Sequence, residues 1–269
     1  MRIYGIDFTS RPKRSKPITC MCCNLEGTTL HAGELQEWTS FQDFEHALTQ
    51  PGPWIAGIDF PFGQSRKFIE NIGWAQSWNG YVAHIASMDR NTFRKALDDY
   101  RAPSREGDKE HQRQSDIKAG SISPQKLYGV PVGLMFYEGA PRLLSSGVTI
   151  PHIHKGDPQR LVVEAYPGIL ARTLIGRRSY KQDTKSKQTT DHLKARGEML
   201  HKITNGALQQ SHGLSVIAAQ ELANDPGADH LDALLCAIQA AWAWTNKDKN
   251  FGAPTNLDPI EGWIAGPAC

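Results

Sequence analysis

MRIYGIDFTSRPKRSKPITCMCCNLEGTTLHAGEL, residues 1–35, decides the fold class, because it reads as three strands in direct succession. Residues 2–9 form a buried apolar run, and a turn at 11–16 leads to a second strand at 17–25 and a third at 28–35. The turns are short, and the apolar residues follow the period of two that is typical of strands. These features predict a three-stranded meander at the start of the chain.

The rest of the chain adds two predicted strands and several helices. Residues 54–60 and 161–164 are apolar runs of strand length, and Ser40 is a suitable N-cap for a short helix. The region between these strands, 64–155, reads as a largely helical insertion, except that the polar stretch 104–118 predicts a mobile loop. Further helices are expected near 65–72, 76–87, 90–101, 129–145, 168–176, 190–205, 214–222 and 228–244.

The order of these elements determines the predicted architecture. Three antiparallel-type strands, a helix, a strand, an insertion, a strand and further helices do not alternate as the elements of a doubly wound sheet do. We therefore expect a single α/β domain over residues 1–269, with a mixed five-stranded sheet flanked by helices. A chain of 269 residues can bury a large core without disulfides or a structural metal.

Composition excludes several classes of protein. The chain is 39% hydrophobic and 22% charged, and no run of about 18 apolar residues or signal-peptide core is present. These features predict a soluble, cytoplasmic protein without membrane association. The five cysteines are an odd number and lack zinc-ligand spacing, so buried reduced thiols are expected. A net charge of +2 excludes coating of nucleic acid through bulk charge.

Acidic residues recur where the predicted strands end. Gly5-Ile6-Asp7-Phe8 and Gly57-Ile58-Asp59-Phe60 each place an aspartate just past an apolar run, and Glu164 ends the fifth strand. Asp229 and Asp232 lie three residues apart on one face of the last helix. Singly, each acid could begin a turn or a helix, or pair with an arginine.

Together, these acids would need a cation. Two carboxylates about 4 Å apart repel by roughly 4 kcal/mol at an effective dielectric near 20. Oxygen-only ligands favour Mg²⁺ or Mn²⁺, and two such ions can support phosphodiester cleavage.

Four short motifs carry a resemblance to a known family. They are Gly5-Ile6-Asp7, Ile58-Asp59-Phe60-Pro61-Phe62-Gly63, Glu164-Ala165-Tyr166-Pro167 and Asp229-His230-Leu231-Asp232-Ala233-Leu234. In order and spacing they resemble the DUF429 family, described as predicted nucleases of the ribonuclease H-like fold. The resemblance spans nearly the whole chain and implies a ribonuclease H-like sheet.

The resemblance also implies roles for the acids. Holliday-junction resolvases of that superfamily use one acid on the first strand, one on the fourth and a D-x-x-D pair on the last helix. By similarity, these catalytic roles fall on Asp7, Asp59, Asp229 and Asp232, and Glu164 is an additional acid. The implied metal ligands are Asp7, Asp232 and either Asp59 or Glu164.

Basic residues could hold a substrate near these acids. Clustered lysine and arginine neutralise phosphates, although such clusters also occur as solvated loops. Candidates for substrate binding are Arg11, Lys13, Arg14, Lys126, Arg177 and Arg178, and the second basic stretch continues through Lys181, Lys185 and Lys187.

The leading hypothesis is therefore a metal-dependent phosphodiesterase or nuclease that acts on nucleic acid or a nucleotide with Mg²⁺ or Mn²⁺. One alternative is ATP-dependent phosphoryl transfer, because actin-like and sugar-kinase cores place a motif such as Asp7-Phe8-Thr9-Ser10 around ATP phosphates. Another is a non-catalytic module that binds nucleic acid or protein. Glycine-rich phosphate loops of the Walker and dinucleotide types are absent from the sequence.

Overall fold

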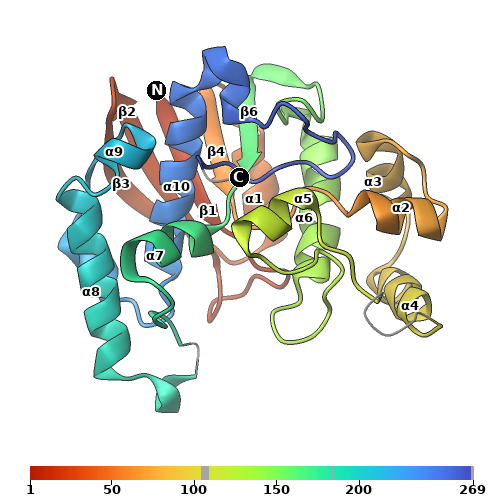
Figure 1. Cartoon of the computed structure of the whole chain (residues 1–269), viewed down its shortest axis with the longest axis horizontal. Helices are drawn as coiled ribbons and strands as arrows, with labels where there is room; N and C mark the ends of the chain where they lie inside the picture. Colours follow the sequence, from red (N-terminus) through yellow and green to blue (C-terminus); the bar gives the residue numbers. More distant parts are fainter. Residues whose placement is uncertain (104–108, 183, 268–269) are drawn as a thin grey trace.

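A mixed sheet forms the centre of the computed structural model, which describes residues 1–103, 109–182 and 184–267 (Figure 1). Its seven strands lie in the order β5-β6-β4-β1-β2-β3-β7. Strand β2 is antiparallel to β1 and β3, and the remaining neighbours pair in parallel. The strands are β1 (Arg2–Asp7), β2 (Ile18–Glu26), β3 (Thr29–Trp38), β4 (Trp54–Ile58), β5 (Val148–Thr149), β6 (Asp157–Glu164) and β7 (Ser215–Ile217).

The α/β class and the N-terminal meander are confirmed, but the prediction of five strands is wrong. The two additional strands, β5 and β7, are short edge strands, and β7 lies where a helix was predicted at 214–222. Three residues carry too few side chains to show a period of two. Pairing of β7 with β3 makes this segment a strand.

Helices cover both faces of this sheet. Ser40 caps α1 through a capping box with Asp43, as its position predicted. No helix in the described part of the chain is long and apolar enough to cross a membrane. The α-helices are α1 (Phe41–Leu48), α2 (Arg66–Ile72), α3 (Trp78–Ala86), α4 (Arg90–Arg101), α5 (Gln114–Ala119), α6 (Val132–Ser146), α7 (Pro167–Ile175), α8 (Thr190–Thr204), α9 (Gln209–His212) and α10 (Asp229–Thr245).

The prediction of a mobile loop at 104–118 is wrong for its second half. Residues 104–108 lie outside the described residues, but Arg113 begins an ordered turn that leads into α5. Arg113, Ser115 and Asp116 are buried, although a polar segment was expected to be solvated. The cause is an ion-pair network that is described below.

Two hydrophobic clusters follow the alternation of the strands. Ile3, Met21 and Leu161 point to one face of the sheet, where α7, α8 and α10 pack. Ile6 and Ala56 point to the other face, which α1 and the insertion helices α3, α4 and α6 cover. Figure 1 shows this division, with α7 to α10 gathered apart from the insertion helices α2 to α6.

Glycines on β1 and β4 allow α10 to lie unusually close to the sheet. A Cβ atom on Gly5 would stand 1.9 Å from the carbonyl oxygen of Ala233, and one on Gly57 would stand 2.3 Å from that of Cys236. Only a residue without a side chain fits at either position. The repeated Gly-Ile-Asp motif therefore sets both the helix contact and, two residues later, the acid on the same face of the sheet.

Candidate acidic site

Asp7 and Asp59 lie side by side at the carboxyl ends of the neighbouring parallel strands β1 and β4. Ile6 pairs with Ile58, and the N–H of Asp59 donates to the carbonyl oxygen of Ile6 at 2.9 Å. Because side chains alternate along a strand, both aspartates share the face of Gly5 and Gly57, on which α10 packs.

Helix α10 brings Asp229 and Asp232 to these strand ends. Asp232 is fully buried, and its carboxylate accepts hydrogen bonds from the Tyr180 hydroxyl at 2.6 Å and from the Lys181 ammonium at 2.5 Å. Asp229 lies one turn earlier and pairs with Lys16 at 2.7 Å. The Lys181 side chain is about half exposed, at 49%, and its ammonium contacts the fully buried Asp232 carboxylate.

Burial and mutual repulsion shift the pKa values of these carboxylates. Burial and the negative charges of Asp232, Asp229 and Asp59 raise the pKa of Asp7 well above its ordinary value, and Lys181 opposes this shift. Burial, offset by Lys181 but reinforced by Asp232, raises the pKa of Asp59 to about 7. In residues 1–103, 109–182 and 184–267, no donor hydrogen-bonds to the carboxylate of Asp7 or Asp59. These two carboxylates are desolvated without direct compensation.

The Glu164 side chain points away from the other acids. Its register partner on β4 is Ile58 and not Asp59, so its side chain leaves the sheet on the opposite face, toward the insertion. There its carboxylate accepts two hydrogen bonds from Arg113, at 2.5 and 2.7 Å, and one from the N–H of Phe62 at 2.8 Å. Arg113 also pairs with Asp116, and both are almost completely buried. Glu164 therefore joins the insertion to the sheet.

The donor chemistry of the site suits a hard divalent cation, because every candidate ligand is a carboxylate oxygen. Four carboxylates, Asp7, Asp59, Asp229 and Asp232, face two lysine ammonium groups, so negative charge remains in excess. In the described part of the chain, however, no group of three or more His, Cys, Asp or Glu side chains has the arrangement that holds a metal ion. Lys181 supplies the positive charge that lies closest to Asp232.

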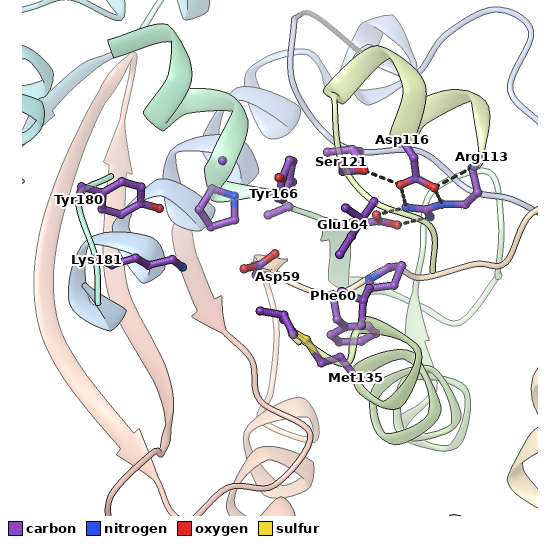
Figure 2. A pocket seen from close by; sticks show the side chains of 18 residues that line it. Asp59, Phe60, Arg113, Asp116, Ser121, Met135, Glu164, Tyr166, Tyr180 and Lys181 are labelled. Carbon is purple, nitrogen blue, oxygen red and sulfur yellow. Dashed lines mark hydrogen bonds and ion pairs between the residues drawn. The ribbon is translucent and has the colours of Figure 1, made fainter. Parts of the chain in front are cut away.

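A pocket of about 340 Å³ opens beside Asp59, between the sheet and the insertion. Figure 2 shows Asp59 between Lys181 on one side and Glu164 on the other, with Glu164 turned toward Arg113. Most of the remaining lining is apolar: it includes Ile122, Val130, Val132, Met135, Pro167 and Ile264. Its size falls within the range of small-molecule sites.

The predicted basic residues do not gather in one place. Arg11, Lys13 and Arg14 lie exposed on the turn between β1 and β2. Lys126 lies 5.0 Å from the ring of Tyr128 and does not line the pocket. Arg177 and Arg178 follow α7 and line an open hollow that adjoins the pocket.

Three residues of this site were not predicted from the sequence to take part in it. Lys181 was named only as part of a basic stretch that could contact phosphate; in the structure its ammonium pairs with Asp232. Tyr180 precedes it and hydrogen-bonds to the same carboxylate. Arg113 lay in the predicted mobile loop; the local signal for its order is the spacing to Asp116, three residues later, whose carboxylate accepts a hydrogen bond from the backbone N–H of Arg113 at 2.9 Å.

Comparison with known proteins identifies a family without assigning an activity. A family model described as "Protein of unknown function (DUF429)" matches residues 5–256. This range includes both Gly-Ile-Asp motifs, Glu164 and the acids of α10. No curated protein and no solved structure matches the chain.

Proposed function

The chain belongs to the DUF429 family of proteins of unknown function, and we propose that it is a divalent-cation-dependent phosphodiesterase or nuclease with a ribonuclease H-like core. The observation that carries this proposal is the juxtaposition of Asp7 and Asp59. Asp7 is buried and Asp59 is partly buried, and both lie at the ends of adjacent parallel strands, lack hydrogen-bond donors within the described chain and face further acids on α10.

Such an arrangement costs stability unless a cation neutralises it. Asp7 and Asp59 together with Asp232 would hold the ion, and Asp229 would serve as a further ligand or as a base. Mg²⁺ or Mn²⁺ would supply a charge that stabilises a phosphoryl oxygen and lowers the pKa of a bound water. Lys181, which lines the pocket beside Asp59, would shift from Asp232 toward the substrate when the ion binds.

Glu164 has a structural role in this proposal. Its charge is matched by Arg113, and the pair holds one wall of the pocket in place. Of the two candidates for the middle ligand, Asp59 is therefore favoured, because no residue that the structure describes pairs with its carboxylate in this way and it shares a face with Asp7.

The test is hydrolysis of bis(p-nitrophenyl) phosphate, a simple diester, with Mn²⁺ and with a chelator. We expect Mn²⁺-dependent release of p-nitrophenol by the wild type and a loss of at least about 100-fold in Asp7→Asn and Asp59→Asn. Asp99→Asn is a matched control on the exposed face of α4, where Lys95 is the only ion-pair partner of Asp99 among the described residues. Equal activity in Asp7→Asn and Asp99→Asn would refute the proposal.

A further inference from the structure

The pocket beside Asp59 adjoins a second hollow, which is lined by basic side chains. The two share Gly168 and Tyr180 in their linings, so one elongated ligand can extend from one to the other. Three arginines, Arg172, Arg177 and Arg178, line the second hollow. The elongated site therefore has an acidic centre at Asp59, an apolar wall and a basic end.

Two of these arginines lack an acidic partner among the residues that the structure describes. Arg177 is exposed and makes no hydrogen bond or ion pair there. Arg172 contacts only neutral groups: the carbonyl oxygen of Ala119, and Tyr166 through its hydroxyl and its ring. Arg178, by contrast, pairs with Glu198 at 2.5 Å. The basic end of the site thus has positive charge that the protein itself does not neutralise.

The N-terminus of α7 adds to this charge. Pro167 and Gly168 form its first turn, no side chain caps it, and both residues line the pocket. The first N–H groups of a helix attract anions where the protein leaves them without an acceptor. Pro167 has no N–H and the N–H of Ile169 donates to the carbonyl oxygen of Tyr166 at 3.1 Å, so the N–H of Gly168 is the group that this terminus offers to an anion. Gly168 also lines the hollow of the arginines, so a helix terminus and Arg172 and Arg177 meet at one place.

The apolar wall restricts what can occupy the rest of the site. Ile122 and Val130 are 42% and 61% exposed, although both are large hydrophobic residues beside a pocket. Together with Tyr166 they could contact one flat, apolar group such as an unstacked nucleobase. Paired and stacked bases of a duplex could not enter a pocket of about 340 Å³.

From these observations we infer that the substrate is a single-stranded oligonucleotide, bound with one base against the apolar wall and a phosphate next to the scissile one held by Arg172, Arg177 and the N-terminus of α7. This inference rests on the proposed function, because it assigns the scissile phosphate to Asp59. It predicts that a phosphate flanking a dinucleotide adds affinity, and that the added affinity depends on Arg177.

The experiment compares thymidine dinucleotides that differ only in a terminal phosphate. TpT, its 5′-phosphorylated form and its 3′-phosphorylated form are titrated by calorimetry into wild type, Arg177→Gln and the control Arg94→Gln, with Ca²⁺ and again with a chelator. Arg94 is likewise exposed and unpaired within the described residues, but it lies on α4, remote from the site. We expect one terminal phosphate to tighten binding at least about fivefold in the wild type and in Arg94→Gln, and by less than twofold in Arg177→Gln.

A second variant pair tests the apolar wall. Ile122→Asn/Val130→Asn changes two exposed side chains and should weaken binding of all three dinucleotides, whereas Ile117→Asn, an exposed control on α5, should not. Equal affinity of the wild type for TpT and for both phosphorylated forms would overturn the inference.

The inference and the proposed function can fail separately. Hydrolysis of bis(p-nitrophenyl) phosphate requires no second phosphate, so it tests the function alone. Dinucleotide binding with a chelator requires neither metal nor turnover, so it tests the basic end alone.

Discussion

Both carboxylate oxygens of Glu164 accept hydrogen bonds from the guanidinium of Arg113, which joins a segment of the insertion to the end of β6. Asp116 binds the same guanidinium, so Arg113 lies between two buried acids. We expect Glu164→Gln to cost about 2 kcal/mol of unfolding free energy, because it weakens bonds to a buried charge. Arg113→Met should cost about 4 kcal/mol, because it leaves two carboxylates buried together.

Urea unfolding measures both changes, and calorimetry with Mn²⁺ separates structure from metal binding. Glu164→Gln should retain an affinity for Mn²⁺ within about twofold of the wild type. Full stability combined with loss of Mn²⁺ binding would instead make Glu164 a ligand.

The raised pKa of Asp59 predicts an unusual dependence of stability on pH. Its pKa is about 7 in the folded protein but near 3.8 when unfolded, so the folded state holds this proton more tightly. Its stabilising contribution is complete below pH 4 and is lost as the pH rises toward 7, and the raised pKa of Asp7 acts in the same direction.

Asp59→Asn should remove part of this dependence and stabilise the cation-free protein at pH 8 by roughly 2 kcal/mol. The measurement is urea unfolding at pH 5 and pH 8 in a chelator. His212, whose pKa is lowered by burial to about 4, acts oppositely over part of this range, so the difference between wild type and variant is the relevant quantity. An Asp59→Asn variant that is less stable than the wild type at pH 8 would contradict the account.

Lys181 competes with a cation for the acids. Its ammonium binds Asp232, and its positive charge partly offsets the rise in the pKa of Asp7 and of Asp59. Lys181→Met should therefore increase affinity for Mn²⁺ at pH 8 by about tenfold, because one positive charge no longer repels the ion. Calorimetry on Lys181→Met and on Lys185→Met, an exposed neighbour, makes the comparison. Weaker binding in Lys181→Met would show that the lysine supports the ion.

Gly5 sets how closely α10 approaches β1. Gly5→Ala should destabilise the protein by about 3 kcal/mol or more, because the added Cβ would overlap the backbone of α10 at Ala233. Gly197→Ala is the matched control: a Cβ there meets nothing within 4 Å on α8, so it should stabilise the protein by about 0.5–1 kcal/mol. Thermal unfolding of both variants tests the prediction, which would fail if Gly5→Ala left the melting temperature unchanged.

The part of the site that was predictable from sequence depends on local pattern. Asp7 and Asp59 follow identical Gly-Ile pairs at the ends of apolar strands, and Asp229 and Asp232 have helical spacing. Asp7 lies on β1 and Asp229 and Asp232 lie on α10, as these patterns predicted, and Asp59 directly follows β4. The face of the sheet to which the Glu164 side chain points depends instead on the register between β4 and β6. This register cannot be predicted from the local sequence.

Long-range partners explain the other differences. The segment that contains Arg113 is polar and looked mobile, but Glu164 and Asp116 bury its charge. Strand β7 exists because β3 pairs with it, and Lys181 turns toward Asp232 because three further acids surround that position. Apart from the local Arg113–Asp116 pair, each of these contacts joins residues far apart in the chain.

The central claim is that Asp7, Asp59 and Asp232 bind a divalent cation. Titration of Mn²⁺ by calorimetry into wild type, Asp7→Asn/Asp232→Asn and the control Asp99→Asn tests it most directly. The account predicts binding to the wild type and to the control, and its loss in the double variant while the fold is retained. Absence of binding to the wild type, or equal binding to the double variant, would contradict it.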